Sequence, residues 1–280
     1  MLSYVSILWF VVESMQAGRD RPVSDRRSKI LEYVIDNERV DVSELAGMFA
    51  VSQVTVRKDL DGLEKKGLIQ RQHGFAVAIA PDNLLSRLAF HYDLKRRIAA
   101  AAADLVPNGS TVMIESGSCC ALLANEIAKT KRGVTIITNS AFIADYVRTA
   151  QGASIVLLGG DYQPESQVTV GPLVEQCLQN FHVDQLFIGI DGYTVESGFT
   201  GSNHLRAAVV KAMARQARDV IVLTESLKFP RQGAVPLLPA DAVSRVVTDS
   251  GMPHPIQEQL TGSGVLMSKV PANQDGVRIR

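Results

Sequence analysis

The sequence predicts an α/β protein in two parts, and two patterns support that prediction. The first is a group of three helix-like segments and a short hairpin, all before about residue 80. The second begins near Ile98, where short apolar runs rich in β-branched residues alternate with helical segments. Such alternation is typical of a largely parallel sheet covered by helices. We therefore expect a small N-terminal unit followed by a larger α/β domain.

The N-terminal helices are predicted from apolar residues that recur at helical spacing. Gly67 ends the third helix, because glycine readily adopts the left-handed conformation found just after a helix. Two short runs on either side of His73-Gly74 then form a hairpin. Three helices and a hairpin make a winged helix-turn-helix, which we place at residues 24–79. The expected helices are residues 24–37, 42–49 and 52–66.

Strands and helices alternate over residues 98–269, which we assign to the second domain. Residues 80–97 are expected to be a linker that runs into a helix, and residues 270–280 a tail. The expected strands are residues 111–115, 135–138, 154–158, 185–190, 220–224, 244–248 and 265–268. The expected helices are residues 119–129, 141–150, 173–181, 205–217 and 254–260.

The bulk composition excludes several classes of protein. The formal net charge is zero, with 29 Lys+Arg against 29 Asp+Glu, so any binding to nucleic acid must depend on a local patch. Three cysteines are too few for a disulfide framework and suit a reducing cytoplasm. No Cys/His cluster has the spacing of zinc ligands, so we expect neither a metal nor another cofactor.

Residues 1–23 form an extension that contains the apolar run Leu2–Val12. The run lacks a basic segment before it, which argues against a secretory signal, and it is too short to span a membrane comfortably. We favour two explanations: translation starts at Met15, or the run is a disordered tail. No other segment holds 18 consecutive apolar residues, so we expect a cytoplasmic protein without a membrane partner.

The third helix has the division of side chains that a DNA-reading helix needs. Val56, Leu60 and Leu63 fall on one face at 100° per residue, which suits packing on the other helices. Ser52 is expected at the N-cap, where its hydroxyl satisfies a backbone N–H of the first turn. A solvated basic face is the preferred explanation of such a helix when it stands alone. The short helix before it and the hairpin after it favour DNA binding.

Each candidate DNA contact follows from side-chain chemistry. Arg57 can pair with a guanine edge and Gln53 with an adenine edge, each through two hydrogen bonds. Lys58 and Thr55 are better suited to phosphates. Beside the wing turn, Arg71 and His73 can reach the DNA backbone or the minor groove. The candidate DNA-binding residues are Ser52, Gln53, Thr55, Arg57, Lys58, Arg71 and His73.

Four loops rich in glycine and small polar residues follow expected strands. The first, residues 115–120, precedes a helix, so its backbone N–H groups and hydroxyls can hold an anion, although ordinary turn chemistry gives the same pattern. The others are residues 138–140, 158–160 and 188–192. Parallel sheets collect ligand contacts at the carboxyl ends of their strands, so we expect a small anionic metabolite there. The candidate effector-binding residues are Glu115, Ser116, Gly117, Ser118, Cys119, Thr138, Asn139, Gly160, Asp191 and Lys228.

Residues 24–79 resemble the DNA-binding domain of the DeoR/GlpR family of bacterial transcription regulators, and the resemblance continues to about residue 268. The family usually has a second glycine after the wing His-Gly pair, where this chain has Phe75. The wing sequence 71–77 and Gly198-Phe199-Thr200-Gly201 are most similar to YciT-type members. The matching stretches are Val42-Ser43-Glu44-Leu45-Ala46, Val51-Ser52, Thr55-Val56-Arg57-Lys58-Asp59-Leu60, Leu63-Glu64, Gly67 and Arg71-Gln72-His73-Gly74.

The resemblance implies a repressor whose second domain is similar in fold to ribose-5-phosphate isomerase and coenzyme A transferases and senses a phosphorylated, sugar-like metabolite. The family's phosphate loop is usually Asp-x-Gly-(Ser/Thr)-Thr-Thr. Gly117 and Ser118 match that loop, whereas Glu115 replaces the aspartate and Cys119-Cys120 replace the two threonines. The family's later Asp-Ser-Ser-Lys-Phe motif corresponds to residues 225–229, in which Lys228 is a candidate cation. We expect a homo-oligomer that binds paired operator half-sites.

Two other functions remain open at the level of sequence. A sugar-phosphate isomerase-like enzyme would need a base and an electrophile, and Glu115, Asp191 and Glu225 are possible carboxylates outside any recognisable catalytic signature. A thiol sensor would use Cys119-Cys120, because cysteines near a helix N-terminus can have depressed pKa values. Small residues packed in a turn explain the two cysteines more simply.

Overall fold

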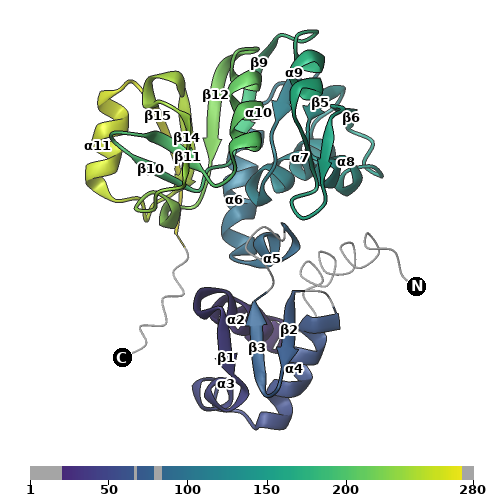
Figure 1. Cartoon of the computed structure of the whole chain (residues 1–280), viewed down its shortest axis with the longest axis vertical. Helices are drawn as coiled ribbons and strands as arrows, with labels where there is room; N and C mark the ends of the chain where they lie inside the picture. Colours follow the sequence, from purple (N-terminus) through teal and green to yellow (C-terminus); the bar gives the residue numbers. More distant parts are fainter. Residues whose placement is uncertain (1–20, 66–67, 79–83, 273–280) are drawn as a thin grey trace. The chain divides into compact units, whose positions relative to one another are not determined.

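The computed structural model describes residues 21–65, 68–78 and 84–272. The expected start at Met15, the apolar run Leu2–Val12 and Gly67 lie outside these residues, as does most of the expected tail. The chain divides into two compact units, Met1–Tyr92 and Asp93–Arg280 (Figure 1).

The first unit contains the three predicted helices and the hairpin. Its elements are α2 (Arg21–Asn37), β1 (Arg39–Asp41), α3 (Val42–Met48), α4 (Gln53–Lys65), β2 (Ile69–Gln72), β3 (Phe75–Ala78) and α5 (Leu84–Ala89). The hairpin strands β2 and β3 pair antiparallel, and β1 adds a third strand in the order β1-β3-β2. We did not expect β1, because three residues are too few to show a strand's alternation. The core is apolar, with Ile30, Val34, Leu45, Val56 and Leu60 fully buried.

The second unit is built on a seven-stranded sheet in the order β15-β14-β12-β9-β4-β5-β6. All neighbouring strands in it pair in parallel, as the alternation of strands and helices predicted. The strands are β4 (Thr111–Ile114), β5 (Val134–Thr138), β6 (Ala153–Leu157), β9 (Val183–Ile188), β12 (Ala217–Leu223), β14 (Arg245–Asp249) and β15 (Leu266–Val270). The helices are α6 (Tyr92–Ala103), α7 (Ser118–Thr130), α8 (Ala141–Tyr146), α9 (Pro172–Leu178), α10 (His204–Ala214) and α11 (His254–Gly262).

The direction of the crossovers distributes helices over both faces of the sheet. From β4 the chain moves through α7 to β5 and through α8 to β6, whereas from β9 it moves the opposite way through α10 to β12. Because parallel crossovers are right-handed, these opposite movements place α7 and α8 on one face and α10 on the other. The strand order therefore reverses between β4 and β9.

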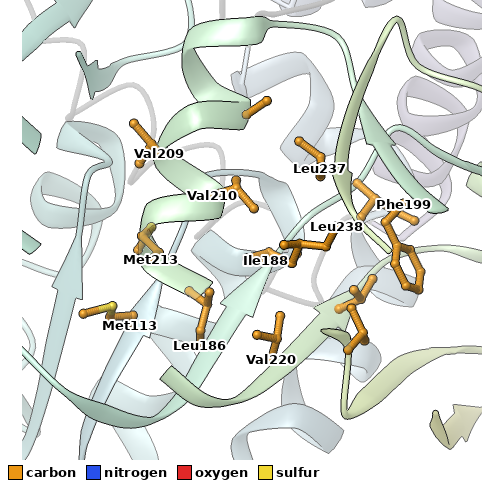
Figure 2. Close-up of a cluster of buried hydrophobic side chains, with 14 of the residues drawn as sticks. Met113, Leu186, Ile188, Phe199, Val209, Val210, Met213, Val220, Leu237 and Leu238 are labelled. Carbon is orange, nitrogen blue, oxygen red and sulfur yellow. The ribbon is translucent and has the colours of Figure 1, made fainter. Parts of the chain in front are cut away.

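Helix α10 and the sheet enclose the main apolar core. Val210 and Met213 of α10 lie beside Leu186 and Ile188 of β9, and all four are buried (Figure 2). Phe199 adds an aromatic side chain from a second sheet (Figure 2). A fully buried side chain of this size stabilises the fold by roughly 1.5–3 kcal/mol. The core therefore holds the sheet's central strands, and the loops that follow them, in fixed positions.

Two small antiparallel sheets were not predicted. One joins β7 (Asp161–Gln163) to β8 (Val168–Val170), and the other has the order β10 (Gly192–Thr194), β11 (Gly198–Gly201), β13 (Val235–Leu238). We expected residues 188–192 to form a loop because glycines interrupt any apolar alternation there. One of these glycines, Gly192, is needed for packing, since a Cβ at this position would collide with the backbone carbonyl oxygen of Arg231.

Candidate functional site

Helix α4 begins as the sequence predicted. The Ser52 Oγ accepts a hydrogen bond from the Thr55 backbone N–H at 3.2 Å and lies 2.9 Å from the Thr55 Oγ1. Ser52 is therefore a typical N-cap that satisfies one free donor of the first turn. The Ser52 and Thr55 hydroxyls thus bond each other in the absence of DNA. To contact a phosphate, either hydroxyl would have to give up this hydrogen bond.

The two faces of α4 are divided as a reading helix requires. Val56 and Leu60 are fully buried against the rest of the unit. Gln53, Arg57 and Lys58 are exposed, and Thr55 is half-buried. The structure thus leaves the candidate base-reading and phosphate-contacting side chains of α4 open to solvent.

Asp59 was not among the predicted site residues, and it fixes α4 to α2. Its carboxylate is buried and accepts hydrogen bonds from the Nε of Arg26 at 2.7 Å and the Nε of Arg27 at 2.9 Å. A buried charge needs such partners, because desolvation is otherwise very costly. The available signal was the helical phase: Asp59 shares the stripe of Val56, Leu60 and Leu63. An acidic residue in that stripe must find a cation inside the unit.

The wing turn places His73 and Gly74 at an exposed tip, both with positive φ. Arg71, the other wing candidate, is tied back to α4. Its backbone N–H donates to the Glu64 Oε1 at 2.8 Å, and its guanidinium forms an ion pair with Asp61. His73 is therefore the more open of the two wing candidates, and Arg71 reaches DNA only if it shares or leaves Asp61.

Phe75, the residue that replaces the family's second wing glycine, has a partner in β1. The Arg39 guanidinium carbon lies 3.9 Å from the centre of the Phe75 ring. A cation over an aromatic face at this distance is favourable by about 0.5–1 kcal/mol at an exposed position. The aromatic ring therefore fastens the wing to β1.

The start of α3, the helix before α4, is also capped. Asp41 accepts hydrogen bonds from the Ser43 hydroxyl and from the Ser43 backbone N–H, the latter at 2.6 Å. These bonds hold the pKa of the Asp41 carboxyl below its ordinary value, because they favour the ionised form. In the same helix, the Glu44 carboxylate accepts a hydrogen bond from Tyr33 at 2.6 Å and raises the pKa of the tyrosine hydroxyl.

In the second unit, the candidate effector residues lie at the carboxyl edge of the seven-stranded sheet. Glu115 and Ser116 follow β4, Asn139 follows β5, and Asp191 comes three residues after β9. The strand order reverses between β4 and β9, and ligands of open α/β sheets bind at such a switch point. The loops after these two strands are neighbours, since a Cβ at Gly189 would lie 3.5 Å from the Ser116 carbonyl oxygen.

The predicted effector residues follow strands that are not all neighbours in the sheet. Gly160 follows the edge strand β6, whereas Lys228 follows β12, four strand spacings away. At about 4.8 Å per spacing, those two strand ends are about 19 Å apart. Lys228 is already paired, with its Nζ 3.6 Å from the Asp191 Oδ1. The central strands β9, β4 and β5 are therefore the best-placed part of the edge.

Gly117 occupies the position that the phosphate-loop comparison assigns to it. It is the N-cap of α7, has a φ of 120°, and provides no capping side chain. The first N–H groups of a helix lack partners within the helix, and together with the helix dipole they attract anions. A Cβ at Gly117 would meet no atom within 4 Å, so space is open beside the N-terminus of α7. Ser118 and Cys119 follow and are largely buried.

Asn139 brings a second polar group to the edge. Its Nδ2 donates to the Thr169 carbonyl at 3.0 Å, while its Oδ1 is buried without a hydrogen-bond partner among the described residues. Thr138 is equally buried, and its Oγ1 accepts from the Ser140 backbone N–H at 3.0 Å. Thr138 therefore shapes the loop after β5. The Asn139 Oδ1 is a hydrogen-bond acceptor that a ligand could use.

Three carboxylates near the edge are engaged by partners within the unit. The Ser116 hydroxyl donates to the Glu115 Oε1 at 2.6 Å. Glu225 forms a buried ion pair with Lys95 of α6, at 3.2 Å. Asp249 accepts hydrogen bonds from the backbone N–H and hydroxyl of Ser226, both at 2.7 Å. Neither Lys95 nor Asp249 was predicted; Lys95 shares the helical phase of the buried residues Ile98 and Ala102, and that was the available signal.

The two adjacent cysteines are packed inside the unit. Cys119 is 6% exposed, Cys120 is fully buried, and the Cys120 Sγ lies 3.9 Å from the Phe187 carbonyl oxygen. All three cysteines are free thiols. Burial limits access of an oxidant, which counts against the thiol-sensor alternative. Within the described ranges, no group of His, Cys, Asp and Glu can hold a metal ion, and no helix is long and apolar enough to cross a membrane.

Comparison with known protein families matches each of the two units to a described domain. Residues 26–82 match the DeoR-like helix-turn-helix domain, and residues 90–250 match the DeoR C terminal sensor domain. The chain belongs to the DeoR family of transcription regulators. This DeoR-family chain is a DNA-binding regulator with a sensor domain, and the isomerase-like enzyme alternative is not supported.

Individual relatives cover nearly the whole regulator. The putative aga operon transcriptional repressor of Escherichia coli O157:H7 is 31% identical over 249 residues, covering 86% of this chain and 92% of that protein. The glycerol-3-phosphate regulon repressor of Escherichia coli K12 is 27% identical, covering 85% and 95%. Among solved structures, ribose 5-phosphate isomerase from Plasmodium falciparum has a TM-score of 0.35 at 14% identity, covering 49% and 52%. A likeness of that size supports no functional inference.

Proposed function

We propose that this regulator is a cytoplasmic repressor that reads a double-stranded operator with α4 and the wing. The observation that supports this most strongly is the division of α4, which buries Val56 and Leu60 and exposes Gln53, Arg57 and Lys58. Such a helix places amide and cationic side chains in the major groove. A homo-oligomer would carry two such helices and bind paired half-sites.

The same proposal places a small anionic metabolite over the strand ends of β4, β5 and β9. The N-terminus of α7 at Gly117 supplies N–H donors for an anionic group. Ser118, in the first turn of the same helix, is a further candidate for binding the anionic group. One relative is named for the glycerol-3-phosphate regulon, which supports a phosphorylated ligand class. The metabolite controls operator affinity by binding one conformation of the regulator better than the other.

Operator binding is tested by selecting sequences from random duplexes with the full chain and measuring affinity by fluorescence anisotropy. The effector is sought by thermal shift with pentose, hexose and triose phosphates beside their unphosphorylated parents, because a ligand of the native state raises the melting temperature. A hit must then change operator affinity. Enrichment of no sequence would contradict the DNA-reading assignment, and stabilisation by the parents alone would contradict the anion site.

Gly117→Asp tests the placement of the anion. It puts a carboxylate where the ligand's negative charge is expected, so the response to a phosphorylated hit should be lost while operator binding remains. Gly117→Ala is the matched control, because its φ of 120° imposes the same backbone strain without the charge. Equal ligand affinity in the two variants would place the anion elsewhere.

A further inference from the structure

Val54 is an apolar residue at an unusual position in the described part of the chain. It is the second residue of α4 and is 74% exposed, more than any other large hydrophobic residue among those described. Arg57 and Lys58 follow it at three and four residues, so all three share one face of the helix. An exposed valine therefore lies in the middle of the face that reads DNA.

Valine at this position has no evident role in the free protein. An exposed β-branched residue adds no core packing, and its helix propensity is lower than that of alanine. A single exposed apolar side chain is common on protein surfaces, so exposure alone indicates little. What distinguishes Val54 is its place in the first turn of a reading helix, where side chains reach base edges.

The major groove presents an apolar group that suits such a side chain. Thymine carries a C5-methyl group there, and cytosine, guanine and adenine carry none. Gln53, directly before Val54, and Arg57, three residues after it, have the amide and guanidinium groups that read polar base edges. We propose that Val54 is a specificity-determining residue that packs against the methyl group of a thymine in each operator half-site. This inference rests on the proposed operator binding by α4.

The test separates the methyl group from the rest of the base. An operator is first selected from random duplexes with the full chain, and each thymine is then replaced in turn by deoxyuridine. Deoxyuridine keeps base pairing and lacks only the methyl group. At one position per half-site, wild-type affinity should fall about fourfold, the equivalent of one buried methyl group. The operator affinity of Val54→Ala should fall by a similar factor for each half-site it contacts, and this variant should bind thymine and deoxyuridine equally at that position.

Two further variants keep the result interpretable. Val195, 61% exposed in the sensor unit, provides the matched control: Val195→Ala makes the same chemical change and should leave the affinity and the deoxyuridine effect unaltered. Val54→Thr keeps one methyl group in the same shape, so it should retain part of the discrimination even if the alanine variant folds poorly.

Several outcomes would overturn the inference. Wild-type affinity that ignores deoxyuridine at every thymine would do so, and that measurement needs no variant. Unchanged discrimination in Val54→Ala would also do so, because the methyl group would then be read by another residue. A change in self-association of Val54→Ala, measured by sedimentation, would assign Val54 to an interface between copies. Failure of the wild type to select any operator would instead contradict the proposed function itself.

Discussion

The buried carboxylate of Asp59 permits a quantitative test of how α4 is held. Its side chain is 3% exposed, whereas those of Arg26 and Arg27 are 23% and 31% exposed. The two arginines can therefore return to water when the carboxylate is removed, but the carboxylate cannot when the arginines are removed. Removing the arginines is the more damaging change.

Replacing one arginine by methionine keeps most of the aliphatic stem and removes one charged hydrogen bond, at a cost of about 1.5–3 kcal/mol. The remaining arginine still neutralises Asp59. Replacing both leaves the carboxylate buried and unpaired, so the double variant should lose about 3–5 kcal/mol or more. The loss in the double variant should exceed that in either single variant, because each arginine compensates for the absence of the other.

Amide hydrogen exchange, followed by mass spectrometry, measures this loss in α4 itself. At about 1.4 kcal/mol per tenfold change, the double variant should raise exchange of α4 amides by roughly two to four orders of magnitude. Amides of β4 and β5, in the other unit, serve as the internal reference. A double variant no worse than either single variant would show that Asp59 is solvated and would refute the reasoning.

Three further predictions concern other charged groups. Arg57→Ala should weaken specific operator binding by about 1–3 kcal/mol, whereas Lys58→Ala should weaken all duplexes and lower the salt slope by about one; normal gel-shift affinity in both would contradict the assignment of α4. Lys95→Met should cost about 3–5 kcal/mol in urea unfolding, because it removes the cation of a buried ion pair, and adding Glu225→Leu should recover part of that loss; a double variant as unstable as Lys95→Met would contradict the importance of the pair. Because the pKa of Asp41 is lowered in the folded chain, its contribution is present above its unfolded pKa and disappears as the pH falls through the folded pKa; the advantage of wild type over Asp41→Asn in thermal melting should therefore begin to decline below about pH 3.8 and vanish at still lower pH.

The sequence alone located those helices and strands whose apolar residues recur at a clear period or whose first turn has a capping residue. The stripe of Val56, Leu60 and Leu63 and the hydroxyl of Ser52 located α4 and its start. The alternation from Ile98 onward located the parallel strands, since the inner strands of such a sheet are covered on both faces and are rich in apolar residues. The small sheets were missed because three or four residues cannot show a period.

The candidate sites were less predictable, because their contacts join residues far apart in the chain. The phase of Asp59 and Lys95 indicates that each charge faces a core, but not which residue compensates it. Arg26 lies 33 residues before Asp59. Likewise, the loops after the strands suggested one edge, but only the strand order shows that Gly160 and Lys228 follow strands four spacings apart.

The charge distribution of α4 explains how a chain of zero net charge keeps cations exposed on the helix that we propose reads DNA. The helix contains three carboxylates, and each one is engaged within the unit. Asp59 is buried between Arg26 and Arg27, Asp61 pairs with Arg71, and Glu64 accepts the Arg71 backbone N–H. Arg57 and Lys58 remain exposed in the N-terminal half of the helix. Because so few cations make up this patch, few counterions should be released per half-site, and base contacts rather than overall charge should determine where the regulator binds.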